Sequence, residues 1–455
     1  MNCNELLVAN LQDKIQQSFE LLSSYDWLIN SYVLDFYVDN HWERLPPCWK
    51  SCFERLEIGK LKDLLLVDSR TENRNVWPLS ICALRVFFRQ FCLSRKLELH
   101  PKDSGKRTRL HEHYQKLFHK SVKLKKRHEI EKFCDDCQRT GKEAEVEYLV
   151  DVGSGQGNLA RTLAYGYGFK VCCIEQDEQL TKAAKVKDEQ LSSSLKKQFN
   201  VELSNHPIHL SRKVDLEKIE PEQFLQMIRD SFNVEKESPF RFGLIGLHPC
   251  GDLAVFLIKL FLSCPEAKFI KLVCCCYMKL STQDQKSQNY GFPLSEFSKS
   301  RCLRLNYEAL EIACHAIEQY CNKLDGHYDE LKVHAYRAAI EKIIVKLHPT
   351  LKHSGLKSTK VTDMSFQLYC DKATSGLGIE LPQAEVGSKD VQSDLNHWER
   401  VVKFYTLRLM FAPLIESVVL YDRLLFMLEQ GISSKIEVIF DPICSPRNHA
   451  LTGCK

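Results

Sequence analysis

The sequence has no export signal, little net charge and no long apolar segment that is free of charged residues. Its N-terminus, MNCNELLVANLQDKIQQSFELL, mixes acidic with apolar residues and lacks the basic start and unbroken apolar run of a secretory signal. A net charge of +4 over 455 residues neither requires nor excludes a nucleic-acid partner. The most apolar segment, 411–428, contains Glu416, Asp422 and Arg423, each of which costs about 2.5–3.5 kcal/mol near a bilayer centre. These absences predict a cytoplasmic or nuclear protein without a membrane partner.

Cysteine is abundant, yet its spacing predicts neither a disulfide framework nor a zinc module. Several of the 20 cysteines are contiguous, at Cys172–Cys173 and at 274–276, and neighbours on a strand point to opposite faces. Cys134 and Cys137 form a lone CxxC with no second pair at zinc-module distance. We therefore expect reduced thiols and no metal site.

The chain is long enough for more than one structural unit. Between about 144 and 276, short apolar runs alternate with helical segments, a pattern typical of a doubly wound α/β fold with a parallel sheet. Helical patterns come before and after this region. The predicted organisation is a helical region at 1–118, a core at 119–280, a helical insertion at 281–430 with a polar, mobile loop at 351–396, and a terminal hairpin at 431–455 that completes the sheet.

The segment YLVDVGSGQGNLA, residues 148–160, reads as a strand followed by a glycine turn and a helix. Gly153, Gly155 and Gly157 allow a sharp turn and the close approach of a ligand. A P-loop would end in Gly-Lys-Ser or Gly-Lys-Thr, and a dinucleotide loop needs its third glycine at 158, where this chain has Asn158. The pattern from Asp151 through Ser154 to Gly157 instead resembles the first motif of class I S-adenosylmethionine-dependent methyltransferases, in which the acid organises the loop near the methionine ammonium.

Two further acids follow the next two predicted strands. Glu175 ends FKVCCIE, where a carboxylate can accept both ribose hydroxyls of an adenosine, a feature that dinucleotide enzymes share. Asp215 follows the third predicted strand, where methyltransferases often hold the adenine amino group. These residues predict an adenosine-containing ligand, and the glycine spacing favours S-adenosylmethionine over NAD.

The reacting group of a doubly wound fold lies beyond the carboxyl ends of its strands. There the segment LIGLHPCGDLAVFL, at 244–257, supplies His248, Cys250 and Asp252, and VCCCYMKL supplies Tyr277. An imidazole suits a general base because it titrates near neutrality. Cys250 leaves two interpretations open, a nucleophile of the kind that 5-methylcytosine enzymes use or a side chain that packs against the cofactor.

Several segments carry a resemblance to a known family: GLHPCGDL, CCCYMKL, KKRHEIEKF and the terminal block LRLMFAPLIESVVLYDRLLFMLEQG…IFDPICSPRNHAL. They resemble the methyltransferase-like protein 25 family, including its relative named as a ribosomal RNA adenine dimethylase domain-containing protein. The resemblance spans most of the chain, and a more distant similarity to tRNA 2′-O-methyltransferases covers only the sheet. It implies S-adenosylmethionine binding and a Rossmann-like, seven-stranded methyltransferase sheet with a terminal antiparallel hairpin, plus N-terminal and inserted helices.

The acceptor is not implied by the resemblance. Adenine dimethylation is disfavoured, because those enzymes use an (Asn/Asp)-Pro-Pro-(Tyr/Phe) turn where this chain has His248-Pro-Cys-Gly. The basic stretch 106–133 suits RNA, with Lys125, Lys126 and Arg127 as candidate contacts, although the family match of KKRHE also suggests a helix start that closes over the cofactor. We predict a methyltransferase that acts on RNA rather than on protein or a small molecule. The alternatives are an inactive scaffold with the same fold and, less favoured, an NAD-dependent oxidoreductase.

Overall fold

The structure is a computed structural model that describes residues 3–66, 75–97, 109–203, 205–214, 220–282, 291–357, 359 and 364–455. The chain divides into two compact units. The sheet unit comprises Met1–Gln16, Ser94–Leu305 and Val418–Lys455, and the helical unit comprises Gln17–Leu93 and Asn306–Ser417. Each unit is therefore assembled from segments that lie far apart in the sequence.

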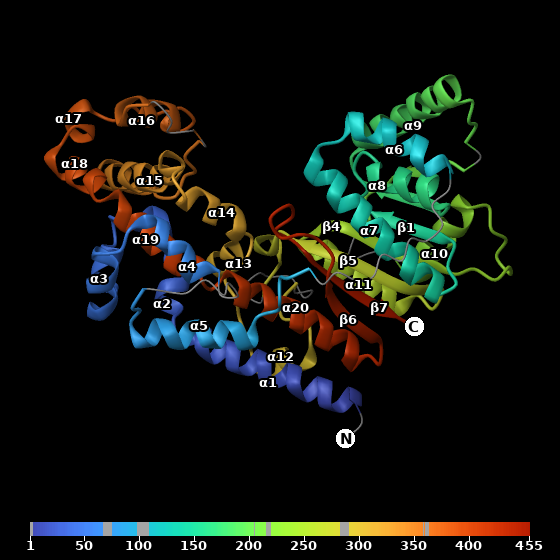
Figure 1. The fold of residues 1–455 in the computed structure, drawn as a ribbon, viewed down its shortest axis with the longest axis horizontal. Coiled ribbons are helices and arrows are strands. Elements are labelled where there is room, and N and C mark those ends of the chain that lie inside the picture. Colours follow the sequence, from blue (N-terminus) through green and yellow to red (C-terminus); the bar gives the residue numbers. More distant parts are fainter. Residues whose placement is uncertain are drawn as a thin grey trace. The chain divides into compact units, whose positions relative to one another are not determined.

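The sheet unit contains one mixed sheet of seven strands in the order β3-β2-β1-β4-β5-β7-β6. Figure 1 labels β1, β4, β5, β7 and β6 of this sheet. Strands β1 to β5 are parallel, whereas β7 pairs antiparallel with both β5 and β6. The last two strands are thus the predicted terminal hairpin, joined to the parallel part through β7. The strands are β1 (Tyr148–Val152), β2 (Lys170–Glu175), β3 (Ile208–Ser211), β4 (Phe242–Cys250), β5 (Ala267–Cys275), β6 (Ser433–Val438) and β7 (His449–Cys454).

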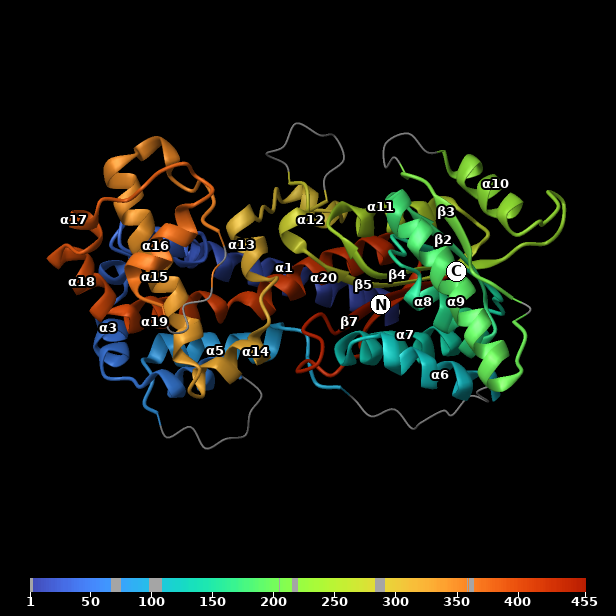
Figure 2. The same cartoon turned by 90° about the horizontal axis from the view of Figure 1, so that it is seen from above.

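Helices cover both faces of this sheet, with α7 on one side and α11 on the other (Figure 2). This arrangement explains why the central strands lack a polar face, since a parallel sheet covered on both sides is apolar throughout. Both α1 and α20 contribute to each unit. The helices of the sheet unit are α1 (Cys3–Ser24), α6 (Arg109–Ser121), α7 (Leu124–Glu143), α8 (Asn158–Arg161), α9 (Glu178–Phe199), α10 (Pro221–Ser231), α11 (Asp252–Ser263), α12 (Glu296–Ser300) and α20 (Ala412–Glu429).

Helix α7 packs onto the sheet through a buried apolar cluster and one buried ion pair. Ile130 and Phe133 are fully buried in the cluster that includes Leu149 of β1. Beside them the ammonium of Lys271, which is 0% exposed on β5, contacts the carboxylate of Asp136 on α7. A buried charge is tolerated only with such a partner, so this pair fixes how α7 lies on the sheet.

The helical unit is built from two separate parts of the chain that interlock. Arg408, which is buried, donates from Nε and Nη2 to the carbonyl oxygens of Leu28 and Ile29, at 3.2 and 2.9 Å. Its helices are α2 (Asp26–Ile29), α3 (Pro47–Glu54), α4 (Lys62–Leu65), α5 (Leu79–Phe91), α13 (Tyr307–Ile312), α14 (Ile317–Leu324), α15 (Tyr328–Leu347), α16 (Phe366–Thr374), α17 (Gln383–Val386), α18 (Lys389–Asn396) and α19 (Trp398–Leu409).

The prediction of a long loop at 351–396 is wrong, because this segment contains α16, α17 and α18. The hydroxyls of Ser365 and Ser388 cap α16 and α18 by accepting backbone N–H bonds from Leu368 and Val391. Such short, capped helices lack an extended apolar period, so their composition resembles that of a loop. The predicted boundaries after residues 118 and 280 also fall inside the sheet unit, which runs from Ser94 to Leu305.

The apolar segment 411–428 lies almost entirely within α20. Its charged residues Glu416, Asp422 and Arg423 are buried. Asp422 accepts backbone N–H bonds from Leu294 and Ser295, at 2.6 and 3.1 Å. Within the described residues, no helix is both long and apolar enough to cross a membrane.

Candidate active site

The glycine turn lies between β1 and α8, at the carboxyl edge of the parallel strands. Gly155 has a φ of +56°, and a Cβ built there would meet no atom within 4 Å, so the backbone faces open space. Gly157 has a φ of +70°, and its Cβ would lie 2.7 Å from Cε1 of His209. The first glycine therefore leaves room for a ligand, and the second permits close packing beneath the turn.

A buried polar network supports the turn from below. Arg161 of α8 donates from Nη1 to Asp188 of α9 at 2.7 Å and from Nη2 to the side chain of Asn158 at 2.8 Å. The second oxygen of Asp188 lies 2.7 Å from Nε2 of His209 on β3. The sequence analysis missed this network, because no local pattern marks a contact that joins three separate elements.

Glu175 closes β2 directly beside the turn, since Val152 of β1 is paired with Ile174 of β2. The backbone N–H of Gly155 donates to Oε2 of Glu175 at 2.8 Å, and that of Asp177 donates to Oε1 at 3.0 Å. Each carboxylate oxygen can accept a second bond. Glu175 therefore holds the turn in shape and keeps acceptor capacity for the hydroxyl hydrogens of a ribose, which stays a prediction.

Asp151 lies under the same turn and is 3% exposed. Burial, followed by the charge of Glu175, raises the pKa of Asp151 to about 7, while the ammonium of Lys126 lowers it. A nearby cation would hold the carboxyl ionised. This environment fits a ligand with a positively charged end, such as the ammonium of a methionine moiety.

The remaining predicted donor residues give less information. Ser154 lies in the turn with its hydroxyl buried, and Gly153 donates its N–H to the carbonyl of Ile174 at 2.8 Å. Asp215, predicted at the adenine, lies outside the described residues. The candidate binding site for the methyl donor therefore consists of the glycine turn, Asp151 and Glu175.

On the acceptor side, His248 follows the regular part of β4 with a φ of +68°. Its Nε2 lies 3.3 Å from Oε1 of Glu129, a carboxylate in the first turns of α7. The hydroxyl of Ser445 donates to the same oxygen at 2.7 Å, and Nζ of Lys125 lies 3.8 Å from it. Three segments that lie far apart in the sequence thus meet around the carboxylate of Glu129. They are the turn at 248–252 (HPCGD), the helix start at 125–129 (KKRHE) and the segment at 445–449 (SPRNH).

Glu129 remains ionised in this setting. Burial alone would raise the pKa of Glu129, but the hydrogen bond and charge of His248, together with the Ser445 hydroxyl and Lys125, produce a net lowering of the pKa. An ionised carboxylate on Nε2 favours the tautomer that carries its proton there and leaves Nδ1 as the acceptor. Glu129 and Ser445 lie in the segments KKRHEIEKF and IFDPICSPRNHAL, but no local pattern predicted a role for either residue.

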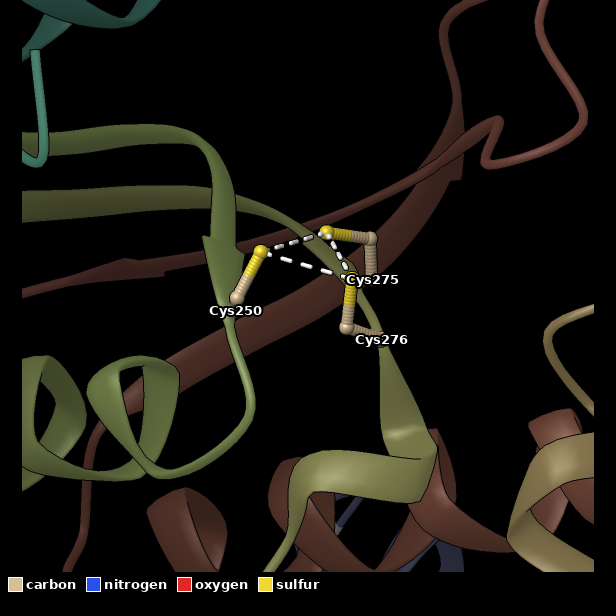
Figure 3. A group of neighbouring side chains, drawn as sticks. All are labelled: Cys250, Cys275 and Cys276. Carbon is tan, nitrogen blue, oxygen red and sulfur yellow. Dashed lines mark hydrogen bonds between the residues drawn. The ribbon is translucent and has the colours of Figure 1, made fainter. Parts of the chain in front are cut away.

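Cys250 lies beside Cys275 and Cys276 at the ends of β4 and β5 (Figure 3). Hydrogen bonding from Cys275 lowers the pKa of the Cys250 thiol to about 5, aided by Cys276, Lys279 and His248 and opposed by burial. The thiol of Cys250 is exposed and readily ionised. These are two requirements for a nucleophile, although its sulfur lies against two other thiols.

The other two predicted acceptor residues have structural contacts. Asp252 begins α11, and its Oδ1 accepts the backbone N–H of Ser281 at 2.9 Å. Tyr277 is 1% exposed, with the guanidinium carbons of Arg423 and Arg447 at 6.0 and 5.8 Å from its ring centroid. Tyr277 thus packs in the interior between these guanidinium groups, and its place beside the acceptor stays a prediction.

The three basic candidates stand at the start of α7. Arg127 uses its Nε to bond the carbonyl of Val122, so part of its guanidinium holds the helix start. Lys125 and Lys126 are exposed, the first near Glu129 and the second close enough to act on Asp151. The helix start therefore lies near Glu129 and acts electrostatically on Asp151, and its closure over the cofactor stays a prediction.

Comparison with known proteins agrees with this geometry. Residues 125–283 match the family model described as a methyltransferase domain. The match begins at the α7 residues beside Glu129 and ends just after β5, so it contains the glycine turn, Glu175 and His248. It therefore covers the described candidate site apart from Ser445.

Two curated relatives extend the similarity. The chain is 28% identical over 228 residues to the probable methyltransferase-like protein 25 of Mus musculus, covering 47% of this chain and 37% of that protein. It is 29% identical over 230 residues to the Homo sapiens protein of the same name, covering 47% and 36%. The aligned region is thus little more than a third of the length of these relatives.

Two solved structures resemble this chain at low similarity. The plantazolicin methyltransferase BpumL in complex with SAH shows 10% identity and a TM-score of 0.20, covering 77% of this chain and 94% of that chain. Coclaurine N-methyltransferase bound to N-methylheliamine and SAH shows 10% identity and a TM-score of 0.21, covering 92% and 95%. With TM-scores this low, the description of the fold of the sheet unit rests on its own strand order.

Proposed function

We propose that this chain transfers a methyl group from S-adenosylmethionine to RNA, with His248 as general base. One observation carries the donor assignment: the glycine turn lies between Asp151 and Glu175 at neighbouring strand ends. The family match of residues 125–283 supports methyl transfer. The sheet order favours this donor over NAD, because the dinucleotide fold has six parallel strands in the order 3-2-1-4-5-6, whereas here an antiparallel β7 separates β5 from β6.

The donor, when bound, supplies an activated methyl group on a sulfonium. Glu175 would hold the ribose hydroxyls, the backbone at Gly155 would lie against the ligand, and Asp151 would face its cationic end. Because displacement at a sulfonium needs only a positioned nucleophile, the protein mainly aligns the acceptor and excludes water. The remaining requirement is to remove a proton from the acceptor.

His248 suits that step. With its Nε2 proton donated to Glu129, the lone pair on Nδ1 accepts the proton of the acceptor hydroxyl or amine as the new bond to the methyl carbon forms. The ionised Glu129 then stabilises the imidazolium, and Ser445 keeps the carboxylate in place. Glu129 is a positioning residue in this scheme, since it contacts the base rather than the acceptor.

The charge beside this base supports RNA as the acceptor class. Lys125 lies 3.8 Å from the carboxylate that orients His248, and Lys125 and Lys126 are exposed. Ammonium groups at this place can hold backbone phosphates next to the nucleotide that is methylated. RNA is therefore favoured over protein or a small molecule, and the HPCG turn still argues against adenine dimethylation.

Two measurements on the purified full chain test this function. Isothermal titration should show binding of S-adenosylmethionine and of S-adenosylhomocysteine but not of NADH. Labelled S-adenosylmethionine should transfer its methyl group to cellular RNA, and His248→Asn should abolish transfer while donor affinity stays unchanged. Donor binding without transfer to any fraction would favour the scaffold alternative, and binding of NADH alone would favour the oxidoreductase.

A further inference from the structure

Three thiols meet at the ends of two neighbouring strands. The sulfur of Cys250 lies 3.5 Å from that of Cys275 and 3.4 Å from that of Cys276, and the last two are 3.6 Å apart (Figure 3). Within the described residues they form a group of potential metal ligands whose sulfur atoms all lie within 4.8 Å of one another. The three sulfurs thus form a nearly equilateral triangle.

The backbone is distorted in a way that creates this triangle. Adjacent residues on a strand point to opposite faces, so Cys275 and Cys276 should diverge. Instead Cys276 has a φ of +51°, a left-handed conformation that costs a residue with a Cβ roughly 1–2 kcal/mol. A register shift between Leu247 and Cys250 also brings Cys250 opposite Cys275. Such strain is often retained at functional sites.

We propose that Cys250, Cys275 and Cys276 bind one zinc ion through their three sulfur atoms. Thiolates are soft ligands that select zinc or copper(I) among common metals. Zn–S bonds of about 2.3 Å separate the sulfurs of a tetrahedral site by about 3.8 Å, against about 4.0 Å in a planar trigonal site. The observed triangle is closer to the tetrahedral face, and its sulfurs need to move apart by only a few tenths of an ångström.

A disulfide explains the arrangement less well. A disulfide joins two sulfurs at about 2.05 Å, and the three nearly equal separations single out no pair. Zinc binding uses all three: each S–H bond gives its proton to solvent, and the sulfur lone pairs form three Zn–S bonds without oxidation. The short helical turn Tyr277–Lys279 directly follows Cys276. The ammonium of Lys279 adds a positive charge to this turn.

The three cysteines differ in their exposure to solvent. Cys275 is buried, Cys276 is half-buried and Cys250 is exposed, so the triangle has one covered and one accessible side. Three protein ligands with an open position are typical of catalytic zinc, whereas structural zinc has four. The zinc would therefore carry a water, or a donor atom of the acceptor, two residues along the chain from His248. Metal binding itself does not depend on the proposed methyl transfer.

The test measures zinc on the full chain, purified under reducing conditions. The wild type should hold about one zinc per chain by elemental analysis, and cobalt(II) should give the absorption of a tetrahedral thiolate site. Cys250→Ser and Cys276→Ser should each weaken zinc affinity at least tenfold in a chelator competition. Cys302→Ser and Cys444→Ser, which change exposed thiols outside the cluster, should bind as the wild type does.

Folding of the variants is checked by thermal melting and by donor titration, so that loss of zinc is separated from loss of the sheet. A Cys250→Ser variant that melts normally, keeps its donor affinity and loses zinc supports the proposal. Full zinc affinity in the Cys250→Ser/Cys276→Ser double variant would overturn it, as would a wild type that binds copper(I) but no zinc. A wild type that does not bind S-adenosylmethionine would overturn the proposed function but would not affect the zinc proposal.

Discussion

Nε2 of His248 lies 3.3 Å from Oε1 of Glu129, which ties the turn after β4 to the start of α7. Through Ser445, the same carboxylate contacts the segment between β6 and β7. One buried acid thus joins the parallel part of the sheet to its terminal hairpin. The same residue therefore contacts both the proposed general base and the terminal hairpin.

Glu129→Gln should lower kcat by about 10–100-fold, because the imidazolium loses its ionised partner while the side chain keeps its shape. Donor affinity, measured by titration, and the melting temperature should change little, and Glu129→Asp should restore part of the rate. Ser445→Ala is the matched control, with a smaller effect because it removes only one hydrogen bond. An unchanged kcat in Glu129→Gln would exclude the positioning role.

Asp151 predicts a pH dependence of donor binding. Its folded-state pKa is raised from 3.8 to about 7, so its contribution to stability is present at low pH and is lost as the pH rises through 7. A cationic donor prefers the ionised form, so its affinity should fall about tenfold per pH unit below 7. Asp151→Asn should flatten this profile and stabilise the unliganded protein at pH 8 by up to about 4 kcal/mol. A wild-type affinity that is constant between pH 5.5 and 8 would contradict this assignment.

Substitutions of the turn glycines should distinguish effects on donor affinity from effects on the stability of the protein. Gly155→Ala places a methyl group in open space and should weaken donor binding with a stability loss of roughly 1–2 kcal/mol from its positive φ. Gly157→Ala should destabilise the protein more, because its Cβ collides with His209. Gly168→Ala has a similar φ of +81° and open surroundings outside the turn, so it is the control for the backbone effect alone. Equal donor affinity in Gly155→Ala and Gly168→Ala would place the ligand elsewhere.

Breaking the buried pair of Lys271 and Asp136 should cost up to about 3–5 kcal/mol of unfolding free energy, since Lys271→Met leaves the buried carboxylate with Arg139 as its remaining cationic partner. Lys271→Met/Asp136→Leu should recover most of that loss. Lys182→Met, which removes an exposed pair with Glu178, should change stability by less than about 1 kcal/mol. Denaturant unfolding measures the unfolding free energy of all three variants. A double variant that is no more stable than Lys271→Met would show that this pair does not stabilise the packing of α7.

The donor half of the site could be predicted from the sequence because its signals are local. A strand, a glycine turn and an acid one strand later are neighbours in both sequence and space, since consecutive parallel strands end at one edge. The α/β fold and the terminal hairpin were predictable for the same reason, from apolar runs of strand length.

The acceptor half could not be predicted in this way. Glu129 and Ser445 are 316 positions apart, and no spacing rule links them. The alternation rule that placed Cys275 and Cys276 on opposite faces was wrong at this point, because Cys276 adopts a left-handed backbone that a sequence does not reveal. Tyr277 sits at the predicted strand edge, but its burial comes from tertiary packing.

The position of β7 in the sheet has a consequence for biosynthesis. β7 pairs with β5 on one side and β6 on the other, yet it is the last of the seven strands to leave the ribosome. Until then the backbone groups along the outer edge of β5 lack their native partner, and an unpaired apolar edge invites association with other chains. This edge is therefore protected only once β7 has left the ribosome and paired with β5.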